Sequence, residues 1–230
     1  MRTIAFLTQK GGTGKTTLAA SLAEAAANAG ERVIALDLDP QGALCRWGKR
    51  REAAKARNKV IVEPLEPERL PRLKSILEGL AEAGFTLVIF DTARAESATI
   101  RPVTDIVDLC LLPARPTRLD IEATTATFRA IFLANRKAAF VLNQCPSTYR
   151  STRASEAAKN LNRLGILADP MLCARMDFQD AVAAGLGVTE YAHDGRAAQE
   201  IAALWNWSRV QITGNKNGSP THRQISGQAA

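Results

Sequence analysis

The sequence predicts an α/β protein with a doubly wound, mostly parallel sheet that is flanked by helices. Short apolar runs alternate with stretches of helical composition along most of the 230 residues. The apolar runs contain few polar positions, which is typical of parallel strands that are buried on both faces. A glycine-rich loop joins the first apolar run to a stretch rich in Ala and Leu, as at the first strand–helix junction of such sheets.

Seven apolar runs are predicted to be strands. In chain order they are residues 2–8, 32–39, 59–64, 85–91, 106–114, 138–144 and 165–169. Helices are expected over 14–29, over 43–57, and from Pro71 to about Gly84. Glycine favours the end of a helix and proline its first position, which places these boundaries.

Length and composition predict one well-buried domain followed by a tail. The 230 residues are 46% hydrophobic and 23% charged, which is the balance of an ordinary globular protein. Residues 1–212 are predicted to form the domain. Residues 213–230 are rich in Gly, Ser, Asn and Gln and contain no core-forming run, so we expect a disordered polar tail.

Cysteine usage and hydropathy favour a cytoplasmic protein. The cysteines are far apart in the chain, at Cys45, Cys110, Cys145 and Cys173. This spacing argues against a disulfide framework and against a local zinc or iron–sulfur site. We read no signal peptide before the first strand, and no apolar run approaches the roughly 18 residues of a membrane span. The net charge of +7 favours an acidic partner without identifying one.

The loop at residues 8–17, TQKGGTGKTT, predicts a phosphate-binding site. It matches the pattern G-x-x-x-x-G-K-[ST] from Gly11 onward, although Gln9 stands where the pattern begins with glycine. Glycines let backbone N–H groups turn toward an anion, and the following helix points its positive end at the same place. Lys15 is expected to reach the outer phosphates and Thr16 to bind Mg²⁺. The predicted nucleotide contacts are Gly11, Gly12, Thr13, Gly14, Lys15, Thr16 and Thr17.

Three carboxylates follow predicted strands beside this loop. Asp37 and Asp39 stand at the end of the run 32–39, and Asp91 ends the run 85–91. Because ligands bind at the carboxyl ends of parallel strands, we expect these side chains to converge on the phosphates. One carboxylate would hold magnesium and another would orient the attacking water. The alternative is that Asp37 or Asp39 only caps the turn before Pro40.

The stretches KGGTGKTT and DLDPQG, with a strand that ends in DT, resemble the deviant Walker A ATPases of the ParA/MinD group. The chain is most similar to the small ParA proteins that segregate plasmids, from about residue 1 to residue 207. The resemblance implies a P-loop NTPase that binds ATP and Mg²⁺. Lys10 is then the signature lysine that reaches phosphates across a dimer interface, with Lys15 in its ordinary role. Asp39 would support hydrolysis, and the magnesium would lie near Thr16, Asp37 and Asp91.

By the same resemblance, the chain is a weak, magnesium-dependent ATPase that works as a switch. ATP would close a homodimer, the dimer would bind DNA without sequence specificity, and hydrolysis would release it. A centromere-binding, ParB-like partner would stimulate hydrolysis, and the ATP-bound state would be associated with the nucleoid. Asn143 resembles the Asn that reads adenine in this group, and the alternative is a loop-turn Asn. In DTARAES, Arg94 and Glu96 depart from the small turn that family members often have there.

Two basic stretches are candidates for the DNA-binding surface. One covers residues 46–59 and the other residues 150–163. A solvated helix face is the alternative for each stretch. Scattered Lys and Arg suffice to neutralise DNA phosphates, and we assign this role to Arg150, Arg153 and Arg175.

Other functions stay open on the same scaffold. A ParA-like scaffold protein would recruit DNA-transfer or other machinery to a cell pole. A MinD-like protein would hold a membrane through a C-terminal amphipathic helix, but we expect Trp205 and Trp207 to close the core instead, so no membrane partner is expected. Metabolic enzymes also use this scaffold, and the nitrogenase iron protein among them would need clustered cysteines.

Overall fold

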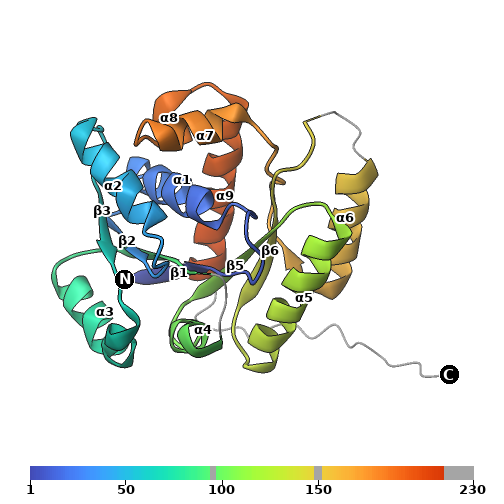
Figure 1. Ribbon diagram of the computed structural model, residues 1–230, viewed down its shortest axis with the longest axis horizontal. Coiled ribbons are helices and arrows are strands. Elements are labelled where there is room, and N and C mark those ends of the chain that lie inside the picture. The colour runs from blue at the N-terminus through green and yellow to red at the C-terminus, as the bar shows by residue number, and fades with distance from the viewer. Residues whose placement is uncertain (94–96, 148–151, 215–230) are drawn as a thin grey trace.

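A seven-stranded sheet forms the centre of the computed structural model, which describes residues 1–93, 97–147 and 152–214 (Figure 1). The strands are β1 (Arg2–Phe6), β2 (Val33–Asp37), β3 (Val60–Pro64), β4 (Leu87–Asp91), β5 (Leu109–Ala114), β6 (Ala138–Leu142) and β7 (Ile166–Leu167). Their order in the sheet is β3-β2-β4-β1-β5-β6-β7, and each neighbouring pair is parallel. The predicted doubly wound sheet is confirmed, and it is parallel throughout.

Helices connect successive strands, and further helices follow the final strand. They are α1 (Lys15–Asn28), α2 (Ala43–Ala53), α3 (Leu73–Glu82), α4 (Ser97–Thr104), α5 (Arg118–Leu133), α6 (Thr152–Leu164), α7 (Met176–Ala183), α8 (Val188–Tyr191) and α9 (Arg196–Thr213). The helix predicted from Pro71 begins later, because residues 67–72 form a 3₁₀ turn first. The helix predicted over 43–57 ends early, and Lys55 just beyond it has a left-handed backbone with φ of 49°.

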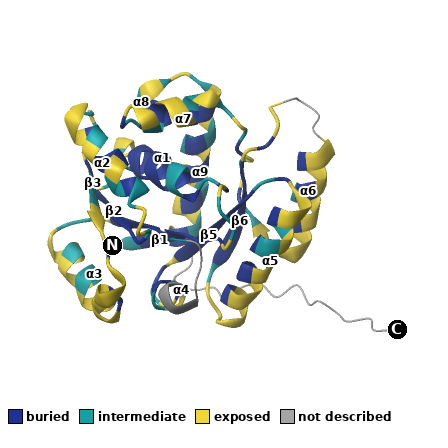
Figure 2. Ribbon diagram, in the orientation of Figure 1, coloured by how far each residue is buried: buried dark blue, intermediate teal, exposed yellow. Residues whose placement is uncertain are grey.

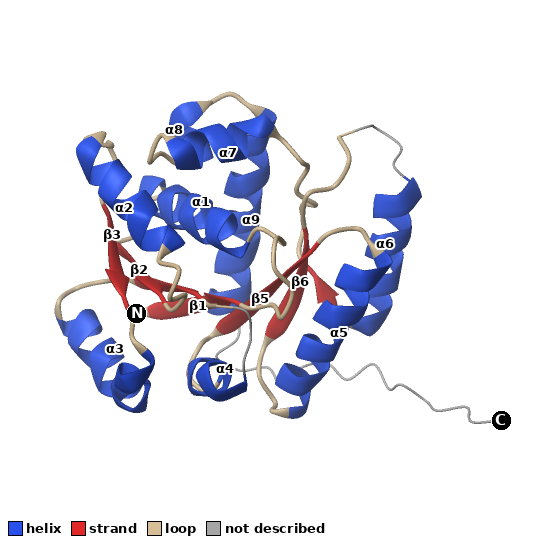
Figure 3. Cartoon of the chain, in the orientation of Figure 1, coloured by secondary structure: helices blue, strands red, loops and turns tan. Residues whose placement is uncertain are grey.

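The helices cover both faces of the sheet (Figure 3). One hydrophobic cluster joins one face of the sheet to α1, α2, α7, α8 and α9. A second cluster joins the other face to α3, α4, α5 and α6. The strands β1, β2, β4, β5 and β6 are buried along most of their length, while the edge strands β3 and β7 are more exposed. Helices α5 and α6 bury one side and expose the other (Figure 2). The chain therefore folds as the two-sided layer structure that apolar parallel strands require.

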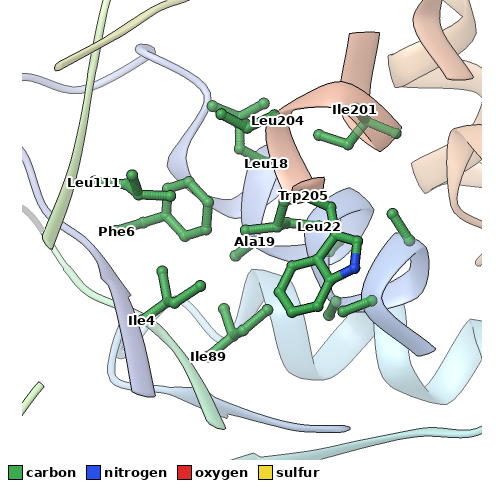
Figure 4. Packing of buried hydrophobic residues seen from close by; sticks show 14 of the residues in the cluster. Ile4, Phe6, Leu18, Ala19, Leu22, Ile89, Leu111, Ile201, Leu204 and Trp205 are labelled. Atoms are coloured by element: carbon green, nitrogen blue, oxygen red, sulfur yellow. The ribbon is translucent and has the colours of Figure 1, made fainter. Parts of the chain in front are cut away.

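The C-terminal helix α9 is part of the core. Trp205 is 3% exposed and packs with Leu18 and Leu22 of α1 in the same cluster as Ile4 and Ile89 of the sheet (Figure 4). Trp207 is partly buried against this cluster. The prediction that the tryptophans close the core is thus confirmed. Among the described helices, none has both the length and the apolar character needed to cross a bilayer.

The boundary of the predicted tail shifts slightly. Thr213 is the last residue of α9 and Gly214 is its C-cap, so the domain extends past residue 212. The remainder of the predicted tail, 215–230, lies outside the described residues, as do Arg94 and Glu96.

A buried polar network, the Arg51 network, joins α1, α2 and α8. Arg51 Nη1 lies 2.5 Å from Glu190 Oε2, Nη2 lies 2.8 Å from Glu190 Oε1, and Nε donates to the carbonyl of Asn58. Glu24, which is fully buried, accepts hydrogen bonds from Asn58 and from the Thr189 hydroxyl. Each charged group of the network therefore has partners within the chain.

Candidate functional site

The glycine-rich loop between β1 and α1 adopts a conformation that only glycine tolerates well. Gly12 and Gly14 have φ of 77° and 92°, in the left-handed region. A Cβ at Gly14 would lie 2.5 Å from Nδ2 of Asn143. Lys15 opens α1 and is 9% exposed, so its side chain enters the protein rather than the solvent. The loop conformation and the helix N-terminus are those of the predicted phosphate site.

Two amide side chains that follow β6 hold this loop. Asn143 Nδ2 donates to the carbonyl of Thr13 at 2.7 Å, and Gln144 Nε2 donates to the carbonyl of Gly12 at 3.0 Å. Both bonds engage loop carbonyls, which leaves the loop N–H groups as the donors for an anion. Asn143 thus contacts the phosphate loop through the carbonyl of Thr13. Its role toward adenine stays a prediction. Sequence reasoning missed Gln144, since nothing in its local pattern marks a loop contact.

Asp91 carries the most unusual electrostatics of the site. Its Cα pairs in register with those of Phe6 on β1 and Asp37 on β2, so β4 brings it beside both the loop and a second carboxylate. It is 0% exposed, and neither side-chain oxygen has a hydrogen-bond partner among the described residues. Burial above all, then the charges of Asp37 and Asp39, raise its pKa to about 7, although nearby Thr16 and Lys15 oppose the shift. A buried carboxyl group without partners favours a bound cation.

Unlike Asp91, Asp37 and Asp39 accept hydrogen bonds from nearby backbone N–H groups. Asp37 Oδ1 accepts from the backbone N–H of Asp39 at 3.0 Å, and its Oδ2 accepts from that of Cys45 in the first turn of α2. Asp39 Oδ1 accepts from the N–H of Gln41. Both carboxylates therefore do accept backbone hydrogen bonds in the turn around Pro40, as expected if they cap this turn. These bonds also orient the two carboxylates at the same edge of the sheet as Asp91.

The residues at this edge fit magnesium. Asp91 supplies two unpaired carboxylate oxygens, and Thr16 on the first turn of α1 supplies a hydroxyl close enough to lower the Asp91 pKa. Among the described residues, no group of three or more His, Cys, Asp or Glu could enclose a metal ion. Magnesium typically takes one or two carboxylates and completes its shell with water and phosphate oxygens. The donor set is thus suited to a metal that arrives with a nucleotide.

Lys10 occupies a position distinct from that of Lys15. Its Nζ lies 2.6 Å from Oδ1 of Asp120 near the start of α5, and its side chain is 32% exposed. Arg115 binds the same carboxylate, with Nε 2.5 Å from Oδ2. Sequence reasoning missed Asp120 and Arg115. The pattern Thr117-x-x-Asp120 was readable as a helix start, and the Thr117 hydroxyl does accept from the Asp120 N–H.

A cavity of about 540 Å³ adjoins the predicted hydrolysis residue. It lies between α2 and β3 and is lined in part by Asp37, Asp39, Lys49, Glu52 and Glu63. None of the glycine-rich loop residues lines it. The cavity therefore lies beside the phosphate site, on the side of Asp39, and leaves room for water or a side chain there.

Two of the three residues assigned to DNA are described, and they belong to different elements, Arg153 to α6 and Arg175 to the N-cap of α7. Arg153 is exposed on α6, whereas Arg150 lies outside the described residues. Arg175 Nη2 lies 2.6 Å from Glu200 Oε1, so its charge is already paired with α9. In the stretch 46–59, Arg51 is buried in the Arg51 network and Arg50 donates to the carbonyl of Val182. Of the assigned arginines that the structure describes, Arg153 is thus exposed and Arg175 is already paired.

Comparisons with known proteins agree with this geometry. Residues 4–188 match the CobQ/CobB/MinD/ParA nucleotide binding domain. The chain is 35% identical over 205 residues to Maintenance of carboxysome distribution protein A of Gloeobacter kilaueensis, covering 88% of this chain and 89% of the relative. It is 31% identical over 132 residues to Protein virC1 of Rhizobium radiobacter, covering 57% of this chain and 56% of the relative.

A solved structure shares the fold. The ATP complex of a variant McdA from Cyanothece superposes with a TM-score of 0.74 at 16% identity, covering 94% of this chain and 97% of that one. The matched domain family spans the phosphate loop, the strand-end carboxylates and the segment that bears Asn143. The chain therefore belongs to the CobQ/CobB/MinD/ParA nucleotide-binding domain family, and it is an ATPase of the ParA/MinD type.

Proposed function

We propose that this ATPase is a positioning switch: ATP closes a homodimer, the dimer binds DNA without sequence specificity, and hydrolysis releases it. The observation that carries the proposal is the pair of lysines on one phosphate loop. Lys15 is buried at the start of α1, whereas Lys10 is one-third exposed at the edge of the loop. A nucleotide bound within one chain needs Lys15 alone, so a second, accessible lysine favours phosphates held by another subunit.

Each residue of the site has a proposed task. Lys15 and the N–H groups of residues 11–17 bind the phosphates, while Thr16 and Asp91 hold magnesium, with Asp37 near it. Bound magnesium neutralises phosphate charge as it develops. Asp39, which is partly exposed and borders the cavity, orients the attacking water. Asp39 is partly exposed whereas Asp91 is fully buried, and this difference in exposure supports separate roles for the two carboxylates.

DNA binding is proposed for exposed cations rather than for paired ones. Arg153 on α6 is exposed, and the net charge of +7 supports a polyanionic partner. Arg175 would have to leave Glu200 before it could contribute. In this proposal a ParB-like, centromere-binding protein accelerates hydrolysis, the ATP-bound state associates with the nucleoid, and the cargo is a plasmid.

A second cargo is favoured by one specific observation. The relative that the chain matches over 88% of its length is named for maintaining carboxysome distribution. A protein assembly could therefore replace the plasmid as cargo while the ATP and DNA cycle stays the same. The partial match to Protein virC1 supports the scaffold alternative in the same way. Deletion of the gene separates these cargoes: loss of plasmid inheritance supports the first, and mislocalisation of a protein assembly supports the second.

The switch is tested with Lys10→Ala and Asp39→Ala. We expect Lys10→Ala to stay monomeric with ATP and to lose partner-stimulated hydrolysis, and Asp39→Ala to dimerise but hydrolyse at least tenfold more slowly. Analytical ultracentrifugation and phosphate release measure the two properties. Lys74→Ala, which changes an exposed lysine on α3, is the matched control. Normal dimerisation and hydrolysis by Lys10→Ala would show that the cross-subunit role is wrong.

A further inference from the structure

Lys10 and Arg115 share a single buried carboxylate, that of Asp120. Lys10 Nζ lies 2.6 Å from Oδ1, and Arg115 reaches Oδ2 at 2.5 Å through Nε and Oδ1 at 3.3 Å through Nη2. The Asp120 side chain is 0% exposed, whereas those of Lys10 and Arg115 are each about one-third exposed. A cation of the phosphate loop and a cation of the connection between β5 and α5 thus share one anion that has no access to solvent.

The electrostatics of Asp120 require at least one of these cations. Burial alone would raise the pKa of the Asp120 carboxyl, but hydrogen bonds from Arg115 and then from Lys10, together with their charges, hold it below its ordinary value. Asp120 also lies in the first turn of α5, where a negative charge is favoured. A buried carboxylate that lost both cations would be left uncompensated, which is the costly outcome for a broken buried pair.

The two cations differ in how freely they can leave. Arg115 is five residues from Asp120, on the short connection between β5 and α5, and it uses the two-pronged geometry that guanidinium groups favour. Lys10 comes from the loop that contacts nucleotide and makes one contact with Asp120. Lys10 can therefore depart while Arg115 remains as the counter-ion of the carboxylate.

We propose that Asp120 is a positioning residue that retains Lys10 in the nucleotide-free chain, and that Arg115 sets how readily Lys10 is released to the phosphates. This rests on the proposed function, in which Lys10 acts on nucleotide across the dimer. ATP-driven dimerisation must then displace Lys10 from Asp120. Because only the released fraction is competent, stronger retention raises the ATP concentration needed, and weaker retention lowers it.

Two variants of this ion cluster have opposite expected effects. Asp120→Asn removes the charge that holds Lys10, so the ATP concentration for half-maximal dimerisation falls by about three- to tenfold. Arg115→Gln leaves Lys10 as the last counter-ion of a buried carboxylate, so that concentration rises by a similar factor. Arg115→Lys keeps a cation at this position and restores dimerisation toward wild type. Arg118→Gln is the matched control, since Arg118 is exposed on the same helix and pairs only with Glu122 among the described residues.

A readout without nucleotide tests retention independently of dimerisation. The rate at which limiting acetic anhydride acetylates Lys10 is followed by mass spectrometry, because an ion-paired ammonium reacts more slowly than a free amine. We expect Asp120→Asn to speed acetylation of Lys10 and Arg115→Gln to slow it, with Lys49 unchanged as the internal reference. If the chain does not dimerise with ATP while these rates change as expected, the proposed function fails and the retention of Lys10 stands.

The opposite shifts in ATP concentration expected for Asp120→Asn and Arg115→Gln also distinguish the proposal from a purely structural role of these residues. A variant that only destabilised α5 would weaken dimerisation whichever of the two residues was changed. Under the proposal, Arg115→Gln has no effect once Asp120 is Asn. The proposal is overturned if both single variants shift the ATP concentration in the same direction, or if neither changes the acetylation of Lys10. Thermal unfolding of each variant verifies that it is folded, and Arg115→Gln keeps the test decisive should Asp120→Asn not fold.

Discussion

The Arg51 network and the surroundings of Asp91 are both buried and charged, yet they are completed in different ways. In the network, Arg51 meets both oxygens of Glu190, and Glu24 accepts two hydrogen bonds from side chains of the same chain. At the phosphate site, Asp91 is equally buried and both its oxygens lack partners among the described residues. Folding thus gives the charges of the Arg51 network their partners but leaves the oxygens of Asp91 without hydrogen bonds from the described residues.

The comparison explains why burial alone does not identify function. Burial raises the pKa of Glu24 just as it raises that of Asp91. Two hydrogen bonds, from Thr189 and Asn58, offset part of the cost for Glu24, whereas around Asp91 Thr16 and the charge of Lys15 oppose the shift and still leave its pKa at about 7. A buried acid with internal partners stabilises helix packing, whereas one without partners stores unfavourable free energy that a cation can release.

The largest expected effect is on folding, from Arg51→Met. Removal of the guanidinium leaves Glu190 and the Asn58 carbonyl without their partner, and a buried pair broken in this way costs about 3–5 kcal/mol. Denaturant unfolding measures the loss, and Lys49→Met on the exposed side of α2 is the control. Equal losses for the two variants would show that the Arg51 network is no more stabilising than the surface.

At the phosphate site, Asp91→Asn is expected to lower catalysis. Without the carboxylate, magnesium-dependent hydrolysis should fall by about 100-fold or more, the cost of losing a charged group that stabilises the transition state. Phosphate release at saturating ATP and Mg²⁺ measures it, with the partly exposed Asp105 changed to Asn as control. A variant that hydrolyses ATP at the wild-type rate would remove Asp91 from the magnesium site.

Asp91 should contribute more to the stability of the nucleotide-free protein as the pH falls below about 7. The folded-state pKa of Asp91 is about 7 against an ordinary 3.8, so the folded chain takes up a proton before the unfolded chain does. Between the two values the free energy of unfolding rises by up to about 1.4 kcal/mol per pH unit of acidification. The difference between wild type and Asp91→Asn in urea isolates this term from that of Glu24. Equal pH dependence in the two proteins would contradict the assignment.

A smaller effect is expected for the residues that hold the loop. Asn143→Ala removes a buried hydrogen bond to the Thr13 carbonyl and should weaken ATP binding about fivefold, the equivalent of about 1 kcal/mol. Gln144→Ala removes the exposed bond to Gly12 and should cost less. Calorimetric titration with a slowly hydrolysed ATP analogue measures both. If Gln144→Ala proves the weaker binder, Asn143 is not the main support of the loop.

The strands and the phosphate loop were readable from the sequence because their signals are local. An apolar run, a glycine spacing and an aspartate at a strand end are each recognised from a few neighbouring residues. Asp120 and Arg115 were not readable, since the pattern at Thr117 has a sufficient local explanation as a helix cap and Lys10 meets Asp120 only in the folded chain. The buried position of Arg51 could not be predicted for a similar reason, because a run of Lys and Arg residues does not indicate which of them pairs with a buried carboxylate.

The hydrogen bond from Asn143 to the phosphate loop can form only late in synthesis of the chain. The carbonyl of Thr13 is held by a side chain 130 positions further along, and Lys10 meets a carboxylate that also emerges much later. At ribosomal rates of about 5–20 residues per second, roughly 7 to 26 seconds pass between synthesis of the loop and synthesis of its support. During that interval the loop lacks this hydrogen bond, so we expect nucleotide capture to be delayed until Asn143 itself has been made.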